Sequence, residues 1–204
     1  MKKLIIVTNI IFATLFCVSA YAFEIRAQVG KTAYQLEAIK PANSFKVMVL
    51  QKGFYLALEK ENFMLYGQDV GIDSLSIGYR YKALPWLFLY AQGGYYHADY
   101  NPSGFGKEGV YLAISKQYGY SAYSMPMSDH YELNYKDSFG AEVGVGVKYP
   151  ISKRLSLDAS IGYRYLRMWA DYDGLDASGA QDWIMSRSED FSAVKIYGGL
   201  SWEF

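Results

Sequence analysis

Hydrophobic and polar residues alternate along much of this chain, and the clearest stretch is the last one. From Val194 to Phe204 every second residue is apolar or, at Gly198, glycine, and the residues between them are polar, tyrosine or glycine. Successive side chains point to opposite faces of a strand, so the pattern predicts a β-strand with one apolar and one polar face. The same alternation predicts further strands at about 23–34, 49–59, 62–68, 72–82, 86–98, 138–149 and 154–168.

The first 22 residues predict a secretory signal peptide that is cleaved off. Lys2 and Lys3 precede an apolar run from Leu4 to about Val18, and Ala20-Tyr21-Ala22 provides the small residues of a cleavage site. The apolar run is short for a transmembrane helix, which needs roughly 20 residues. Residues 23–204 are then expected to form one exported domain without cysteine, because Cys17 belongs to the removed segment.

Composition narrows the fold class. Lys+Arg and Asp+Glu balance at 20 each, which gives no reason to expect nucleic acid as a partner. The 21 tyrosines suit a membrane–water boundary, where the ring is buried and the hydroxyl stays wet. A soluble β-sandwich also contains amphipathic strands. The aromatic chain end and the signal peptide together favour an all-β fold: an eight-stranded antiparallel transmembrane β-barrel, up-and-down, in the bacterial outer membrane.

The connections between the expected strands fall into two groups. Those at 59–62, 83–85 and 150–153 are short, and Lys60-Glu61 is interpreted as a tight turn. The connections at 35–48, 69–71, 99–137 and 169–190 form the second group, and three of these four are long. Outer-membrane barrels have short periplasmic turns and longer external loops, so both termini are expected in the periplasm.

Three segments resemble a known family. The hairpin AEVGVGVKYPISKRLSLDASIGYRY at 141–165, the hairpin IDSLSIGYRYKALPWLFLYAQGG at 72–94 and the final GLSWEF resemble the OmpX/Ail family of small outer-membrane proteins. Trp202 and Phe204 match the terminal aromatic signal that the barrel assembly machinery of such proteins reads. The resemblance implies an outer-membrane barrel, with lipid and lipopolysaccharide as its surroundings and activity located in the loops.

The polar faces of the strands predict a charged lumen. An eight-stranded barrel is just wide enough for its own side chains, and buried charges persist only when paired and hydrogen-bonded. An ion-pair network that fills the lumen is therefore expected, and a narrow channel is the alternative. The residues expected in this network are Glu24, Arg26, Arg80, Glu142, Asp158, Arg164 and Lys195.

Catalytic and metal-binding residues are not expected. His97 lies beside Asp99, and His130 follows Ser128 and Asp129, but a Ser–His–acid set depends on geometry rather than on sequence proximity. We interpret both histidines as rim or loop residues; a lipid-modifying enzyme is the third hypothesis. Asp171, Asp173 and Asp176 form an incomplete calcium-binding pattern, so a solvated acidic loop without metal or cofactor is expected. Arg167 is expected either to contact lipopolysaccharide phosphate or to extend to the membrane boundary.

The long connection at 99–137 is the best candidate for function. Tyrosine provides a large contact area at low entropic cost and is enriched in recognition surfaces. Tyr131, Leu133 and Tyr135 continue a strand-like alternation, so this segment is expected to project as a sheet above the membrane. The alternative is a passive loop. We expect a structural or adhesion-like recognition role, with a host or cell-surface molecule as partner, through Tyr111, Tyr118, Tyr120, Tyr123, Tyr131 and Tyr135.

Overall fold

The computed structural model describes residues 22–35, 41–65, 68–100, 130–175 and 181–204. The predicted signal peptide lies outside them except for Ala22. The strands are β1 (Glu24–Tyr34), β2 (Ala42–Gln51), β3 (Phe54–Leu65), β4 (Gln68–Lys82), β5 (Leu87–Tyr100), β6 (His130–Tyr135), β7 (Ser138–Pro150), β8 (Leu155–Leu175), β9 (Gln181–Asp190) and β10 (Ala193–Glu203). No helix among these residues is long and apolar enough to cross a membrane.

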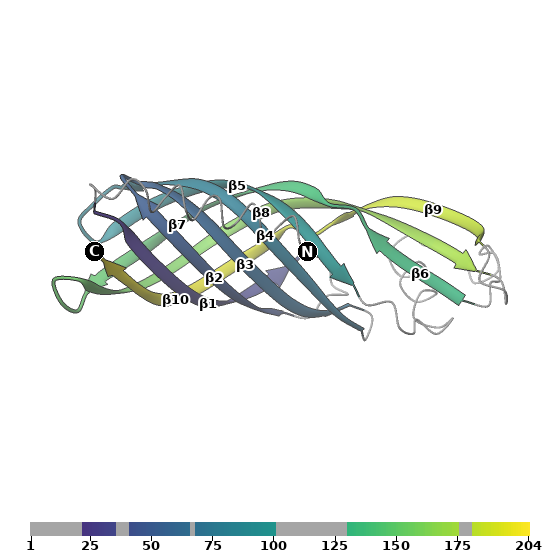
Figure 1. Ribbon diagram of the computed structural model, residues 1–204, viewed down its shortest axis with the longest axis horizontal. Helices are drawn as coiled ribbons and strands as arrows, with labels where there is room; N and C mark the ends of the chain where they lie inside the picture. The colour runs from purple at the N-terminus through teal and green to yellow at the C-terminus, as the bar shows by residue number, and fades with distance from the viewer. Residues whose placement is uncertain (1–21, 36–40, 66–67, 101–129, 176–180) are drawn as a thin grey trace.

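Eight of the strands close into an antiparallel barrel. β1 to β5 pair in chain order, β7 pairs with β5, β8 pairs with β7, and β10 pairs with both β8 and β1 (Figure 1). The register sets Glu24 opposite Glu203, so the first and last strands meet at one end of the barrel. The expected eight-stranded barrel is confirmed. The side of a membrane that this end faces stays a prediction.

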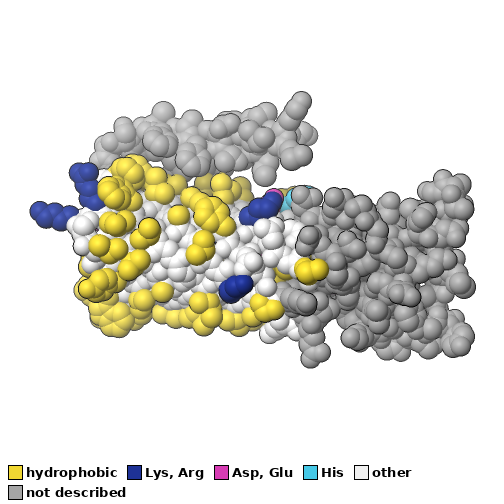
Figure 2. All heavy atoms as spheres, turned by 90° about the horizontal axis from the view of Figure 1, so that it is seen from below, with side chains coloured by type: hydrophobic (Ala, Val, Ile, Leu, Met, Phe, Trp, Pro, Cys, Tyr) yellow, Lys and Arg dark blue, Asp and Glu magenta, His cyan; other side chains and the backbone are white. Residues whose placement is uncertain are grey.

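Strand alternation separates the two surfaces of the barrel wall. In β8, Ile161, Tyr163 and Tyr165 are exposed, while Ser160, Gly162 and Arg164 between them are buried. Figure 2 shows apolar side chains spread over one face of the barrel. A soluble protein rarely exposes so wide an apolar surface, whereas a hydrocarbon surrounding favours it. The wall thus has an apolar exterior and a polar interior.

The expected boundaries between residues 49 and 68 are wrong. The second strand is β2 (Ala42–Gln51), and a tight turn at Lys52-Gly53 leads into β3 (Phe54–Leu65). Both turn residues have positive φ, 52° and 89°, the left-handed geometry that a two-residue hairpin requires. Lys60-Glu61 is not a turn, because it lies inside β3. The connections at the barrel end that holds the chain termini are therefore 52–53, 83–86 and 151–154.

A second, smaller sheet extends beyond the barrel. β8 is 21 residues long; its part up to Leu166 pairs with β7, and its part from Arg167 to Leu175 pairs with β9. β6 pairs with the other side of the same part, from Ala170 to Leu175. We call β6, β9 and residues 167–175 of β8 the projecting sheet (Figure 1). The expectation of a loop throughout 169–190 is wrong, whereas a sheet around Tyr131–Tyr135 is present.

Candidate functional site

The barrel lumen holds most of the buried charge of the described residues. Each of the seven residues expected in the lumen is at most 7% exposed and comes from an inward position of its strand. The structure adds Lys46, Glu59 and Glu61, which are equally buried. These side chains form two groups along the barrel axis, which we call the turn-end cluster and the central cluster.

The turn-end cluster lies near the chain termini. Its centre is Glu24, which accepts from Arg26 at 2.8 Å, Arg80 at 3.1 Å and Lys148 at 2.9 Å. Arg26 also pairs with Asp158 at 3.1 Å, and Lys148 reaches Glu203 at the rim at 2.5 Å. The shared carboxylate of Glu24 holds three cations from β1, β4 and β7 together.

The central cluster pairs three cations with three carboxylates. Lys195 lies 2.5 Å from Glu59, 2.7 Å from Glu61 and 3.5 Å from Glu142. Arg164 forms a fully buried ion pair with Glu61 and donates a hydrogen bond to the Phe191 carbonyl at 3.2 Å. Lys46 lies 3.7 Å from Glu142. The cluster thus ties strands β2, β3, β7, β8 and β10 together through side chains.

Neutral donors complete the central cluster. Tyr90 donates to Glu142 at 2.8 Å and Gln92 donates to the same carboxylate at 3.0 Å. The Gln92 carbonyl accepts from Lys46 at 3.0 Å and from Tyr55 at 3.1 Å. Tyr197 donates to Glu59. Buried ion pairs stabilise only when their remaining hydrogen-bonding capacity is also met, and these tyrosines and the glutamine largely provide it.

An aromatic layer covers the central cluster on the side of the projecting sheet. Phe191 is fully buried and contacts Tyr34, Phe63 and Tyr135 with ring centroids 6.2, 6.2 and 5.2 Å away. Tyr34 also donates to Glu61, and Arg164 lies 5.5 Å from the Tyr34 ring centroid. The charged lumen is therefore closed at this end by packed rings.

The other end of the barrel is open. A cavity of about 500 Å³ is lined by Glu24, Arg80 and Glu203 on the polar side and by Phe23, Tyr79 and Phe204, among others, on the aromatic side. Phe23 and Phe204 stack with centroids 4.6 Å apart, and Trp202 is 43% exposed. We call this cavity the turn-end vestibule. This arrangement does not test whether Trp202 and Phe204 act as a signal for the barrel assembly machinery, and that role stays a prediction.

Residues 136–137 link β6 to β7, and polar side-chain contacts hold this link at the rim of the barrel. Asp137 accepts from Tyr95 and lies 2.6 Å from His97 Nδ1, and Lys136 lies 2.9 Å from Asp171. Partial burial alone would raise the pKa of Asp137, but the hydrogen bonds from Tyr95 and His97 outweigh it and hold that pKa below its usual value. The sequence places His97 beside Asp99. In the structure, however, the carboxylate that His97 contacts is that of Asp137, in the link between β6 and β7.

The rim provides only part of a hydrolytic set. An acid next to a histidine, as in Asp137–His97, is one half of a Ser–His–acid arrangement. Within the described residues no serine hydroxyl is bonded to the His97 ring. Ser128 and Asp129 lie outside the described residues, and His130 is the first residue of β6. The idea of a lipid-modifying enzyme therefore stays a hypothesis.

The acidic pattern of the last predicted loop lies partly in a strand. Asp171 and Asp173 belong to β8, and Asp176 is outside the described residues. Asp171 accepts from Ser186 at 2.5 Å and pairs with Lys136, and these two partners lower its pKa. In the described part of the chain no three His, Cys, Asp or Glu side chains converge as metal ligands. Arg167 lies 5.9 Å from the Tyr165 ring, on the exposed face.

The recognition tyrosines are only partly visible. Tyr111, Tyr118, Tyr120 and Tyr123 lie outside the described residues, and Tyr131 lies in β6 opposite Gly174. Tyr135 is the exception, because it is buried, donates to Glu189 at 2.7 Å and packs on Phe191. Its side chain belongs to the aromatic layer that joins the projecting sheet to the barrel, and its role in recognition stays a prediction.

Solved structures of outer-membrane β-barrels share this fold. The outer membrane protein OprG from Pseudomonas aeruginosa aligns with a TM-score of 0.55 at 12% identity, over 91% of this chain and 96% of that one. A major outer membrane protein from Thermus thermophilus aligns with a TM-score of 0.51 at 13% identity, over 91% of this chain and 100% of that one. The outer membrane protein Ail from Yersinia pestis aligns with a TM-score of 0.43 at 14% identity, over 90% of this chain and 99% of that one. No protein-family model and no curated protein matches the sequence. The fold is thus that of outer-membrane β-barrels.

Proposed function

We propose that this protein is an integral barrel of the bacterial outer membrane with a structural or adhesion-like recognition role, exerted by the projecting sheet and the segment 99–137. The observation that carries the proposal is the extension of β8 past the barrel, where it holds β6 and β9 on either side. Outer-membrane lipid and lipopolysaccharide surround the apolar wall, and the partner is a host or cell-surface molecule. The resemblance to the OmpX/Ail family supports this role.

The open edges of the projecting sheet support recognition by strand addition. Within the described residues the only strand that pairs with β6 or with β9 is β8, so each has one edge that no other described strand covers. Such edges accept an extended segment of another protein, whose backbone provides affinity and whose alternate side chains provide specificity. The aromatic layer at Phe191 anchors this sheet, so that a bound partner is held at a fixed distance from the wall.

The filled lumen favours a plug over the alternative of a narrow channel. An ion that crosses the barrel has to pass both the paired charges of the central cluster and the packed rings around Phe191. We expect the purified protein to give no stable single-channel steps in a planar bilayer. Reproducible steps would favour the channel.

Deletion of residues 104–130 tests the recognition role. The variant retains Tyr131–Tyr135, so the barrel and most of β6 are expected to assemble, with unchanged heat-modifiable gel migration. Binding of expressing cells to host cells or matrix should be lost. A second variant, with 104–128 replaced by a Gly/Ser linker of equal length, separates sequence from length. Wild-type binding by both variants, at equal surface abundance, would overturn the proposal.

A further inference from the structure

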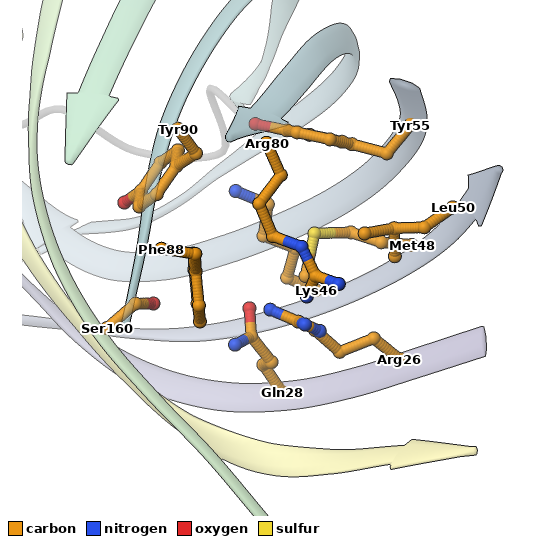
Figure 3. A pocket seen from close by; sticks show the side chains of 10 residues that line it. All are labelled: Arg26, Gln28, Lys46, Met48, Leu50, Tyr55, Arg80, Phe88, Tyr90 and Ser160. Carbon is orange, nitrogen blue, oxygen red and sulfur yellow. The ribbon is translucent and has the colours of Figure 1, made fainter. Parts of the chain in front are cut away.

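A small cavity lies in the lumen between the two charged clusters. Its volume is about 20 Å³, and Figure 3 shows the ten side chains that line it. Three of them are cations, Arg26, Lys46 and Arg80, and two more are polar, Gln28 and Ser160. The other five are apolar or aromatic. No carboxylate lines the cavity among the described residues, although the clusters on either side contain several.

The carboxylates that balance these cations lie away from the cavity. Glu24 holds Arg26 at 2.8 Å and Arg80 at 3.1 Å, and it lines the turn-end vestibule instead. Glu142 lies 3.7 Å from Lys46, within the central cluster. Arg26 also pairs with Asp158 at 3.1 Å, and the Lys46 ammonium group donates to Gln92 at 3.0 Å, so the positive charge nearest the cavity belongs to the guanidinium groups of Arg26 and Arg80. A cavity of this kind attracts a negative species.

Two buried donors at this cavity have no hydrogen-bond partner in the described part of the chain. Nε2 of Gln28 and Nε of Arg26 lack a hydrogen-bond acceptor among the described residues, and both side chains come from residues only 2% exposed. Buried donors are costly to leave unpaired, so a buried group without a protein acceptor indicates a bound species. In Figure 3 the ends of Arg26, Gln28 and Arg80 converge on the same space.

We propose that this cavity binds one small monovalent anion of the halide class, such as chloride. A space of this size holds about one water-sized species, which excludes phosphate and sulfate. The ring of Phe88 lies 5.0 Å from Arg26 and 5.1 Å from Arg80, so the walls are both cationic and weakly hydrated. These walls suit an ion that loses its hydration easily. The proposal is independent of the recognition role of the projecting sheet.

The turn-end vestibule provides the entry. Leu50 and Arg80 line both the vestibule and the small cavity, so the two spaces lie on either side of the same side chains. An anion that enters the vestibule meets Arg80 before it reaches Arg26 and Gln28. The central cluster and the aromatic layer close the path beyond. The site is thus a dead end, which binds an anion without conducting it.

Thermal unfolding of the full protein in detergent micelles tests this site. The midpoint is measured in sodium chloride, bromide and sulfate at equal ionic strength and with increasing concentration. Chloride and bromide should raise the midpoint with saturation, relative to sulfate. Sulfate generally stabilises proteins more than halides do, so a halide advantage is opposite to the general salt effect. No halide advantage would indicate water in the cavity and overturn the proposal.

Variants locate the effect. Gln28→Glu places a carboxylate where the anion is proposed, so the halide effect should disappear. The matched control is Gln51→Glu, because Gln51 ends β2 outside the cavity lining; it should retain the effect. Crystals grown in bromide provide a readout that does not depend on stability, with an anomalous peak expected within contact of Gln28 and Arg26. A halide effect that persists in Gln28→Glu, or bromide found only at the protein surface, would overturn the proposal.

Discussion

The barrel and the projecting sheet use the same strand in different ways. In β8, Arg164 is fully buried and paired with Glu61, whereas Arg167, three residues later, is exposed beside the ring of Tyr165. Up to Arg164 the strand has a barrel neighbour on each side, β7 and β10, and a charged lumen beneath it. Beyond that point its neighbours are β6 and β9, which pair with no other strand among the described residues. The barrel thus stabilises itself through buried, mutually dependent charges, whereas a polar pair at the projecting sheet, Lys136–Asp171, has an exposed lysine.

The largest effect is expected from removing the cation at the centre of the lumen. Lys195→Met leaves Glu59 and Glu61 without their closest ammonium group. Breaking a buried ion pair from one side costs about 3–5 kcal/mol, because the remaining charge is uncompensated. The free energy of unfolding, measured in urea with the protein in micelles, should fall by about that amount.

A second substitution shows how much of the stability lost in Lys195→Met comes from the uncompensated charge and how much from altered packing. Lys195→Met combined with Glu59→Gln removes one of the uncompensated charges, so much of the lost stability should return. The exposed Lys153→Met is the control and should change little. If Lys195→Met unfolds like the wild type, the ion pairs of the central cluster do not stabilise the barrel as described.

A destabilisation of intermediate size is expected where the first and last strands close the barrel. Two adjacent glycines of β10, Gly198 and Gly199, allow it to be measured. An alanine Cβ at Gly199 would lie 2.1 Å from the backbone oxygen of Ala27, in the paired strand β1. At Gly198 the nearest atom would be 4.0 Å away. Gly199→Ala should therefore destabilise the barrel by about 1–3 kcal/mol, as overpacking does. Gly198→Ala should be close to neutral; equal unfolding midpoints for the two variants would argue against the β1–β10 register.

The polar pair between the β6–β7 link and the projecting sheet should matter far less to the stability of the barrel. Lys136 and Asp171 lie 2.9 Å apart, and the Lys136 side chain is 62% exposed. Exposed ion pairs typically stabilise by about 0–1 kcal/mol. Lys136→Ala should leave heat-modifiable migration and the barrel unfolding midpoint nearly unchanged. A loss as large as that of Lys195→Met would mean that the two regions unfold as one unit.

The smallest effect is expected from acid at the link between β6 and β7. Hydrogen bonds from Tyr95 and His97 lower the pKa of Asp137 despite its partial burial. A carboxyl whose folded pKa is depressed stabilises above its ordinary pKa of about 4, and the stabilisation is lost as pH falls through the folded value. The small stability difference between wild type and Asp137→Asn should therefore shrink as pH falls below about 4 and vanish only below the lower pKa of the folded state. A difference that grows with acid would contradict this assignment.

The sequence predicts the barrel best where alternation is uninterrupted, as in β7 and β10. It misleads between residues 49 and 68, because the charged pair Lys60-Glu61 resembles a turn while the real turn is the short Lys52-Gly53. In β3 these two charges alternate like any strand residues: Lys60 points outward near Asp73, and Glu61 points into the lumen. A lysine–glycine pair between two alternating runs was the signal for the turn.

Other features have no local signal at all. The contacts among Lys195, Glu59 and Glu142 join three strands far apart in sequence, so alternation gives their face but not their partners. The projecting part of β8 contains Asp171 and Asp173, residues typical of loops, and it is a strand only because β6 and β9 pair with it. Tertiary pairing here outweighs intrinsic preference.

Hydrogen exchange along β8, with the protein in lipid nanodiscs, tests the contrast between barrel and projecting sheet most directly. Amides from Leu155 to Leu166 should exchange very slowly, because barrel strands and lipid cover them on every side. Amides beyond Ala170 should exchange much faster, with the change occurring near Arg167. Fast exchange throughout β8 would contradict a closed barrel in the membrane, and uniformly slow exchange would contradict a separate projecting sheet.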